Sequence, residues 1–231
     1  MTVMIEVERL SKQFRLHQQG EMILPVLTDI NLSVHRSECV VLDGASGSGK
    51  STLLRALYGN YLASSGAIWV THQGARVDLC SAHSQLQLAI RRETIGYVSQ
   101  FLRVIPRVAT IDVVSQPLID RGVAPEQARQ KAGELLQQLH IAERLWTLPP
   151  GTFSGGEQQR VNIARGLIAD YPILLLDEPT ASLDRANAEV VVGLIDAARS
   201  RGSAIIGIFH DHLCRDAIAD RLFTVKAQAQ A

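Results

Sequence analysis

The sequence predicts an α/β fold in which a parallel sheet is preceded by an antiparallel β layer and interrupted by an inserted α-helical block. Three observations support this prediction. Near the start, Met4–Val7 and Ile30–Val34 alternate apolar and polar residues, the period of a strand with one solvated face. Later, residues 173–177 and 204–209 are almost continuously apolar, as is typical of parallel strands buried on both faces. Residues 101–169 follow the periodicity of helices.

The predicted elements alternate strand and helix along the rest of the chain. An apolar strand at 38–43 runs into a glycine-rich turn and then into a helix, the order of a strand–loop–helix unit. In the helical block, Ala128, Ala132 and Leu136 share one face of a predicted helix. In chain order, we expect a strand at 38–43, helices at 51–58, 125–140 and 155–168, a strand at 173–177, a crossover helix at 187–201 and a strand at 204–209.

Composition limits the domain count and the classes of partner. The chain has 231 residues, 46% of them hydrophobic, which is enough for one good-sized core. We therefore predict a single domain, 1–231, with an α-helical subdomain at approximately 101–169. The formal net charge is zero, which does not favour direct binding of nucleic acid. Apolar runs such as Ile173–Leu176 are far shorter than the roughly eighteen residues that span a bilayer, so we expect no membrane insertion.

The three cysteines and the first ten residues indicate the cellular compartment of the protein. Cys39, Cys80 and Cys214 are odd in number, far apart and without C-x-x-C spacing, so neither a disulfide framework nor a zinc site is expected. The start, Met1–Leu10, alternates apolar with charged residues and lacks the apolar core of a signal peptide. We therefore expect a cytoplasmic protein.

A glycine-rich run joins the strand at 38–43 to its helix. Residues 44–51, GASGSGKS, fit the pattern G-x-x-x-x-G-K-[ST] in the strand-to-helix context that this pattern requires. The glycines let backbone N–H groups close around a phosphate, Lys50 can reach the β- and γ-phosphates, and the Ser51 hydroxyl is placed to ligate Mg²⁺. The alternative is a loop that only turns a strand into a helix. The residues expected to hold the nucleotide here are Gly44, Ala45, Ser46, Gly47, Ser48, Gly49, Lys50, Ser51 and Thr52.

Two acids end the apolar strand at 173–177. Asp177 can hold the Mg²⁺ shell, while the adjacent Glu178 can polarise an attacking water. Adjacent acids at a strand end could instead form a solvated turn. Together with the glycine-rich loop, they predict hydrolysis of a nucleoside triphosphate.

A third motif indicates the family. Residues 154–160, SGGEQQR, taken with Gln100, Asp184 and His210 in this order, closely resemble the signature set of the ABC ATPases, and the resemblance covers nearly the whole chain. It implies a P-loop NTPase core with an N-terminal antiparallel β layer and an inserted α-helical subdomain, and ATP and Mg²⁺ as cofactors. Phe153 stands where the family usually has Leu, and Ala45 where Pro is frequent, but neither departure removes a phosphate contact.

The resemblance also implies a second subunit. In this family the Ser-Gly-Gly element clamps the γ-phosphate of ATP held by the opposite ABC subunit, so we expect a head-to-tail homodimer or heterodimer. A helix N-terminus with Ser and two Gly suits an anion on physical grounds, although Ser154 could act only as an N-cap. The nucleotide-binding residues expected here are Ser154, Gly155, Gly156 and Glu157.

The remaining roles come from the resemblance and have structural alternatives. Gln100 would touch Mg²⁺ or the attacking water, and His210, at a strand end, could hold the γ-phosphate, Glu178 and water in line. Asp184 would communicate across the dimer, or cap the helix that follows it. Phe14 would stack on adenine, or belong to the core. The predicted catalytic residues are Glu178, His210, Lys50 and Gln100, and the predicted metal ligands are Ser51, Gln100 and Asp177.

Two kinds of partner assembly are compatible with the sequence. Residues 55–62, 98–107 and 152–166, supported by 205–211, resemble the ATP-binding component of the bacterial carbon-phosphorus lyase system. This implies a subunit of the alpha-D-ribose 1-methylphosphonate 5-triphosphate synthase assembly, with the lyase core proteins as partners. The overall resemblance to the ATPases of lipoprotein release and macrolide export leaves a membrane transporter's motor as the alternative.

The segment after Gln100 bears on the partner. It carries Arg103 and Arg107 among the apolar residues Phe101, Leu102, Val104 and Ile105. In transporters of this family the corresponding loop lies in the groove that receives the membrane subunit, and a soluble partner is equally compatible. The alternative is that this segment only packs the helical block.

Overall fold

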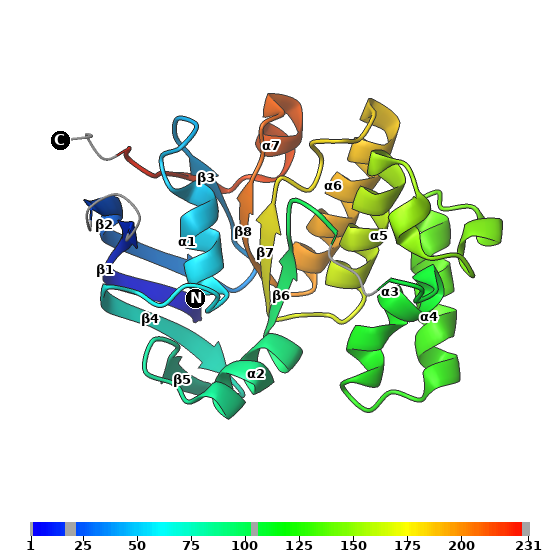
Figure 1. Ribbon diagram of the computed structural model, residues 1–231, viewed down its shortest axis with the longest axis horizontal. Coiled ribbons are helices and arrows are strands. Elements are labelled where there is room, and N and C mark those ends of the chain that lie inside the picture. Colours follow the sequence, from blue (N-terminus) through cyan, green and yellow to red (C-terminus); the bar gives the residue numbers. More distant parts are fainter. Residues whose placement is uncertain (1, 17–21, 103–105, 228–231) are drawn as a thin grey trace.

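The computed structural model describes residues 2–16, 22–102 and 106–227 and arranges them in layers (Figure 1). An antiparallel sheet lies on one side, a parallel sheet stands in the middle, and helices fill the other side. Within the described residues, the antiparallel sheet has four strands and the parallel sheet has five. The predicted combination of a β layer, a parallel sheet and a helical block is confirmed.

The bounds of the elements are as follows. The antiparallel strands are β1 (Val3–Leu16), β2 (Met22–His35), β4 (Ser65–His72) and β5 (Ala75–Asp78). The parallel strands are β3 (Cys39–Asp43), β6 (Ile95–Val98), β7 (Ile173–Asp177), β8 (Ala204–Ile208) and β9 (Arg221–Thr224). Within the described residues, the antiparallel sheet has the strand order β2-β1-β4-β5 and the parallel sheet the order β6-β7-β8-β3-β9. The α-helices are α1 (Lys50–Leu57), α2 (Ser84–Glu93), α3 (Thr110–Ile119), α4 (Pro125–Gln138), α5 (Gly155–Leu167), α6 (Arg185–Ser200) and α7 (His212–Ile218), with short 3₁₀ turns at Glu143–Leu145 and Pro150–Thr152.

Side chains of the parallel sheet alternate between two hydrophobic cores. Ile173 and Leu175 of β7 face the core shared with α1 and the antiparallel sheet. Leu174 and Leu176 face the core shared with α3, α4, α5 and α6. Because successive side chains of a strand point to opposite faces, a strand between two cores must be apolar throughout. This is why β7 is found at 173–177 as the unbroken apolar run predicts.

The first two strands are much longer than predicted. The alternation of apolar and polar residues is interrupted because β1 and β2 shift register between Val7 and Leu10 and again between Leu10 and Lys12. Arg9 and Asp29 both adopt left-handed backbone conformations there, with φ of 48° and 49°. A bulge breaks the period of two while the pairing of the strands continues, so the pattern predicts two short strands where the structure has one long hairpin.

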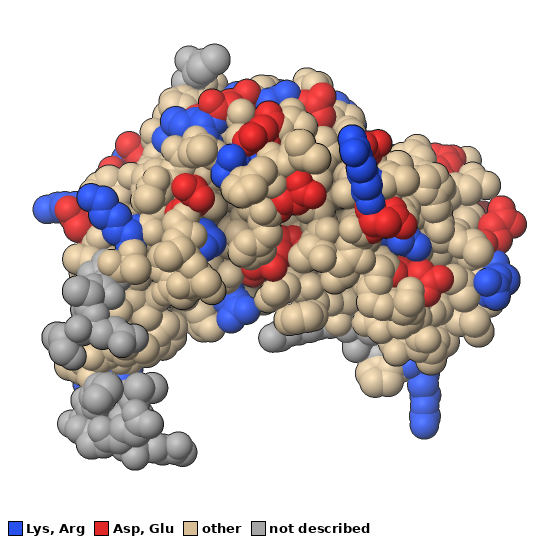
Figure 2. Space-filling model, turned by 90° about the horizontal axis from the view of Figure 1, so that it is seen from above, with Lys and Arg blue, Asp and Glu red and all other residues tan. Residues whose placement is uncertain are grey.

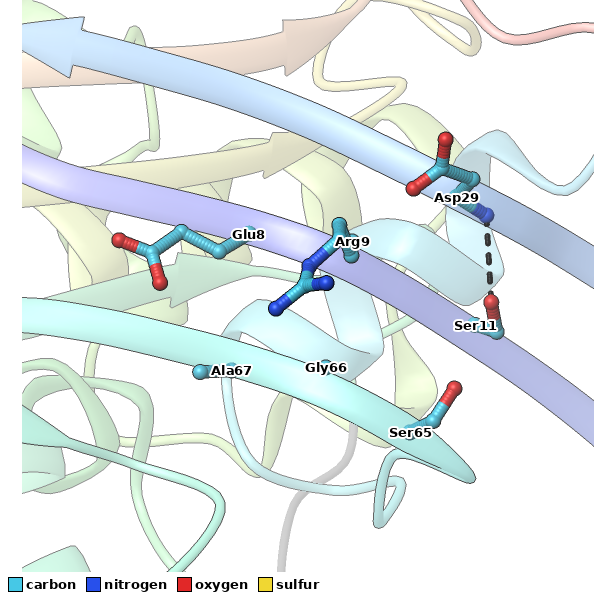
Figure 3. Close-up of a pocket in the computed structure, with 7 residues that line it drawn as sticks. All are labelled: Glu8, Arg9, Ser11, Asp29, Ser65, Gly66 and Ala67. Carbon is cyan, nitrogen blue, oxygen red and sulfur yellow. Dashed lines mark hydrogen bonds between the residues drawn. The ribbon is translucent and has the colours of Figure 1, made fainter.

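The bulged region forms a pocket of about 420 Å³ on the antiparallel sheet (Figure 3). The Asp29 backbone N–H donates to the Ser11 hydroxyl at 3.1 Å, which closes one end, and Figure 3 shows the Arg9 side chain directed towards the strand that carries Ala67. On the strand opposite, Gly66 has φ 86°, and a Cβ there would lie 2.6 Å from the Glu8 carbonyl oxygen. The sheet therefore needs glycine at this position.

We expect Gly66→Ala to lower the free energy of unfolding by about 2 kcal/mol or more, because the methyl group meets backbone atoms and the positive φ is strained. Gly74 is the matched control: its φ is 81°, but no described heavy atom lies within 4 Å of a Cβ built there. Gly74→Ala should therefore cost only the conformational penalty of about 1 kcal/mol. Urea unfolding of the two variants measures the difference, and equal losses would contradict the close contact.

Other helix bounds differ from the predictions by a few residues. The crossover helix α6 begins at Arg185, two residues before the predicted start, because the Asp184 carboxylate caps it by accepting from the Asn187 backbone N–H at 2.9 Å. The strand predicted to reach Phe209 ends at Ile208. Acidic and basic side chains are interspersed over the face seen in Figure 2, in keeping with the zero net charge. Across the described residues, the structure has no helix with both the length and the apolar character needed to cross a membrane.

Candidate functional site

The carboxyl ends of neighbouring parallel strands bring the predicted catalytic residues together. In the order β6-β7-β8-β3, Gln100 follows β6, Asp177 and Glu178 end β7, His210 follows β8, and the glycine-rich loop follows β3. Ligands of open α/β sheets bind at this edge, outside the carboxyl ends of the strands. The structure therefore gathers at one edge residues that are up to 166 positions apart, since the loop begins at residue 44 and the histidine is residue 210.

The glycine-rich loop is tightly wound at the N-terminus of α1 (Figure 1). Gly44, Gly47 and Gly49 have φ of 137°, 77° and 101°, which side chains rarely adopt. The Lys50 ammonium donates to the carbonyl oxygens of Gly44 at 2.6 Å and Ala45 at 2.9 Å. A helix N-terminus and a lysine thus lie in one place, which suits a phosphate group. Ala45, Ser46 and Gly47 are exposed, Gly44, Gly49, Lys50, Ser51 and Thr52 are half-buried, and Ser48 is buried.

Asp177 is buried, with 1% of its surface exposed, and both of its carboxylate oxygens accept hydrogen bonds. The Ser51 hydroxyl donates to Oδ1 at 3.0 Å and the Tyr97 hydroxyl donates to Oδ2 at 3.2 Å. Burial raises the pKa of Asp177, while these two hydrogen bonds act in the opposite direction. The predicted metal ligands Ser51 and Asp177 are therefore in direct contact.

Glu178 links the other predicted catalytic residues. His210 Nε2 lies 2.7 Å from Glu178 Oε1, and Gln100 Nε2 donates to Oε2 at 3.2 Å. The Glu178 backbone has φ 54°, and its N–H donates to the carbonyl oxygen of Ile208 in the neighbouring strand at 3.1 Å. The left-handed backbone thus directs a carboxylate to a point where a histidine and a glutamine converge on it.

The oxygen-rich donor set fits Mg²⁺ and the loop fits a triphosphate. A hydroxyl, a carboxylate and an amide, from Ser51, Asp177 and Gln100, are the kinds of ligand that Mg²⁺ takes together with phosphate oxygens. In the loop, Lys50 supplies a positive charge next to the helix N-terminus. These observations agree with the cofactors that the sequence predicts, ATP and Mg²⁺.

The Ser-Gly-Gly segment caps helix α5. The Ser154 backbone N–H and hydroxyl donate to Glu157 Oε2 at 2.9 and 2.7 Å, and Ser154 Oγ accepts from the Glu157 N–H at 3.4 Å, which is a capping box. These bonds to Ser154 lower the pKa of Glu157. Ser154 and Gly155 are exposed, and a Cβ on Gly156 would lie 3.1 Å from the Ser182 carbonyl oxygen. The capping alternative for Ser154 is confirmed, and its contact with a partner's nucleotide stays a prediction.

The two glycine-containing motifs are on opposite faces of the parallel sheet. Helix α1, which follows the phosphate-binding loop, belongs to the core shared with the antiparallel sheet. Helix α5, which follows the Ser-Gly-Gly segment, belongs to the helical core on the other face (Figure 1). One chain therefore carries two separate anion-suited helix ends.

Phe14 lies outside this arrangement. Its ring meets the Tyr61 ring edge-on, with centroids 5.3 Å apart and an interplanar angle of 82°, and the Lys12 ammonium lies 4.8 Å from its centroid. The ring is half-buried by these neighbours. Its stacking on adenine stays a prediction.

Three further residues support the site and were not predicted. Tyr97 contacts Asp177, as described above. Gln159 donates to the Pro179 carbonyl oxygen at 3.1 Å, just after the carboxylates of Asp177 and Glu178, and Asn162 donates to the Ser99 carbonyl oxygen at 2.5 Å. Gln159 and Asn162 are both 5% exposed. A polar side chain on the buried face of a helix is a sequence signal that could have identified both residues.

A groove of about 1040 Å³ runs beside Gln100. Its walls combine arginine and tyrosine side chains with apolar residues at the opening, where Phe101 is 73% exposed and Leu88 is 62% exposed. Leu102, in contrast, packs against the helical core, so the segment after Gln100 contributes to both regions. Residues 103–105, including Arg103, lie outside the described residues. The side chains that line it include Arg55, Tyr58, Tyr61, Arg91 and Tyr97.

A phosphate-binding loop at a strand-to-helix turn, with an aspartate and a glutamate at the end of a neighbouring parallel strand, places the chain among the P-loop nucleotide hydrolases. The sequence model of the family described as "ABC transporter" matches residues 27–181. The chain belongs to this family, and its cassette is an ABC ATPase domain.

Relatives and solved structures agree with this family. A macrolide export ATP-binding/permease protein MacB 1/2 of Paracoccus denitrificans (strain Pd 1222) is 37% identical over 197 residues, which is 85% of this chain and 29% of the relative. MacB of Salmonella choleraesuis (strain SC-B67) is 33% identical over 225 residues, or 97% and 33%. The chain thus spans about a third of the length of these curated relatives. In all, 3216 curated proteins match the chain.

Among solved structures, the dimeric post-hydrolysis state of the ATP-binding cassette MJ0796 bound to ADP and Pi superposes with a TM-score of 0.87. The two chains are 30% identical, and the superposition covers 96% of this chain and 94% of that one. The ABC cassette fold predicted from the sequence is therefore confirmed.

Proposed function

We propose that the chain hydrolyses ATP with Mg²⁺, and that Glu178 is the residue that polarises the attacking water. The observation that carries this proposal is the convergence of His210 and Gln100 on the two oxygens of the Glu178 carboxylate. A carboxylate held on both sides can accept a proton from water in one fixed direction, which is the requirement for in-line attack on a phosphoryl group.

The other residues of the site bind and orient the triphosphate. Lys50 and the loop 44–52 hold the phosphates, and His210 lies beside Glu178, where it can also reach a γ-phosphate. Ser51, Asp177 and Gln100 would hold Mg²⁺, which neutralises charge on the β- and γ-phosphate oxygens. The protein thus contributes positioning and electrostatic stabilisation.

We further propose that the working unit is a head-to-tail dimer with a second ABC subunit. The separation of the Ser154–Glu157 capping box from the phosphate-binding loop supports this, because the two helix ends cannot enclose one nucleotide from opposite faces of the sheet. In such a dimer, Ser154, Gly155, Gly156 and Glu157 of one subunit meet the nucleotide of the other, and Asp184 lies beside the same interface.

The partner assembly that we propose is the bacterial carbon-phosphorus lyase system, in the cytoplasm. Three stretches, 55–62, 98–107 and 152–166, resemble PhnL, its ATP-binding component. All three stretches contribute residues to the groove beside Gln100, among them Tyr61, Phe101 and Asn162. The chain would then perform ATP-driven conformational work in the alpha-D-ribose 1-methylphosphonate 5-triphosphate synthase assembly, with the lyase core proteins as partners.

The second candidate is the motor of a membrane transporter of the macrolide-export or lipoprotein-release type. The curated relatives support this candidate more directly than the first, because the MacB proteins are macrolide export ATP-binding/permease proteins by name. However, the matched region is the cassette, and 3216 curated proteins match it. An identity of 33–37% therefore identifies the chain as an ABC cassette but does not specify which partner the cassette serves. The exposed Phe101 suits either kind of partner.

Co-purification distinguishes the two candidates. The chain is tagged and recovered from its source cells grown with a phosphonate as the phosphorus source, and the recovered proteins are identified by mass spectrometry. The first candidate predicts recovery of the lyase core proteins together with a second ABC subunit. Recovery of an integral membrane permease without lyase core proteins would refute the first candidate and establish the second. The tagged Phe101→Ala chain is the matched control, since either partner should be depleted when the exposed ring is removed.

A further inference from the structure

Tyr97 connects the predicted metal site to the groove. Its hydroxyl donates to Asp177 Oδ2 at 3.2 Å, while the Ser51 hydroxyl donates to Asp177 Oδ1 at 3.0 Å. Burial, followed by the charge of Asp177, raises the pKa of Tyr97 to about 12. Because an ionised carboxylate only accepts hydrogen bonds, the Tyr97 hydroxyl is the donor in this contact.

The Tyr97 ring is itself fixed by the wall of the groove. It lies 4.9 Å from the Tyr58 ring, centroid to centroid. The Arg55 guanidinium donates to the Tyr61 hydroxyl at 3.2 Å, and it is near enough to Tyr97 to oppose the rise in the pKa of that hydroxyl. The Arg91 guanidinium lies 5.0 Å from the Tyr58 ring centroid. Aromatic and guanidinium groups therefore restrict the movement of the Tyr97 ring.

The orientation of a metal-binding carboxylate depends on the hydrogen bonds that its oxygens make with neighbouring groups. Asp177 is 1% exposed, so water cannot readily replace a lost donor. Without the Tyr97 hydroxyl, Asp177 would keep only the bond from Ser51 among the side-chain hydrogen bonds described, and Ser51 is itself a predicted metal ligand. Among the described side-chain donors to Asp177, the Tyr97 hydroxyl is thus the one that is not itself a predicted metal ligand.

We propose that Tyr97 is a positioning residue whose hydroxyl holds Asp177 in the orientation that binds the Mg²⁺ of Mg·ATP. This inference rests on the proposed ATPase function. Tyr97 does not touch the nucleotide in this role; it acts through Asp177, and its ring ties that carboxylate to the wall of the groove.

The test compares Tyr97→Phe with the wild-type chain in binding, without relying on turnover. A fluorescent ATP analogue is titrated in EDTA and then with increasing Mg²⁺, and the Mg²⁺ concentration that gives half of the gain in affinity is recorded. We expect this concentration to rise roughly tenfold in Tyr97→Phe, as for other residues that orient metal ligands. Binding in EDTA, which depends on the loop and Lys50, should not change.

Tyr58→Phe is the matched control. It removes a hydroxyl from the same wall of the groove but keeps the ring that packs against Tyr97. Its Mg²⁺ dependence should equal that of the wild type. In steady-state assays, Tyr97→Phe should regain a near-normal kcat at high Mg²⁺. If Tyr97→Phe does not fold, Arg55→Met removes the guanidinium that lies near the Tyr97 hydroxyl and should shift the Mg²⁺ dependence in the same direction.

Each outcome has one meaning. An unchanged Mg²⁺ dependence in a folded Tyr97→Phe chain, or an equal change in Tyr58→Phe, overturns the positioning role. Equal weakening of nucleotide binding in EDTA and in Mg²⁺ also overturns the positioning role, because the substitution would then disturb the whole site and not the metal ligand alone. If the wild-type chain itself shows no Mg²⁺-dependent nucleotide binding, it is the proposed ATPase function that fails.

Discussion

Glu178→Gln should reduce phosphate release by the active dimer or complex by roughly 10²- to 10⁴-fold, the usual contribution of a positioned general base. The amide has nearly the shape of the carboxylate and can still lie between His210 and Gln100. It has no negative charge, however, and cannot take a proton from water. Because Lys50 and the loop are unaltered, ATP should still bind. Phosphate release at saturating Mg·ATP and binding of a fluorescent ATP analogue measure the two quantities.

The control for this variant is Glu189→Gln. Glu189 is a 67% exposed carboxylate on α6 that pairs with Arg185, and its loss should leave phosphate release unchanged. Unchanged phosphate release by Glu178→Gln would mean that another group activates the water, and the proposed role of Glu178 would be wrong.

Gly156→Asp should abolish hydrolysis by the dimer while the isolated chain still binds ATP. The new carboxylate would stand at the N-terminus of α5, where the proposed dimer places the partner's γ-phosphate, and two anions there repel each other. The loss of phosphate release should be on the order of 10²-fold or more, as when a donor to a reacting oxyanion is removed. Size-exclusion chromatography and nucleotide binding are measured on the same samples.

Gly193→Asp provides the matched charge on an exposed glycine of α6, and it should leave hydrolysis unchanged. Because a Cβ at position 156 is 3.1 Å from the Ser182 carbonyl oxygen, thermal melting should accompany the assay to confirm folding. Loss of ATP binding by the isolated Gly156→Asp chain would indicate that both helix ends act on one nucleotide in the same chain. Fast turnover by a proven monomer would contradict the composite site.

Much of the site could be predicted because it follows from strand order. Lys50, Asp177, Glu178 and His210 each stand next to an apolar run or a glycine-rich turn, and parallel strands bring their carboxyl ends to one edge. The strand at 173–177 was predicted with its correct bounds because all five of its residues are buried.

The unpredicted parts depend on contacts between distant segments. Strand β6 has only four residues and no distinctive pattern, so the position of Tyr97 opposite Asp177, 80 residues away, is decided by tertiary packing. The long hairpin was missed because its bulges interrupt the period of two. Helix periodicity cannot distinguish a cap from a partner-facing anion site at Ser154, since the same residue types serve both purposes.

At Glu178, the left-handed backbone puts the stability of the fold in conflict with the proposed ATPase activity. At φ 54°, glycine or asparagine would relieve about 1 kcal/mol of conformational strain. Selection for folding alone would therefore favour a residue without the carboxylate that the proposed hydrolysis needs. Under the proposed role of Glu178, stability at this strand end is lost in exchange for a carboxylate at a fixed angle, and a screen for thermostable variants should preferentially recover inactive chains altered at this residue.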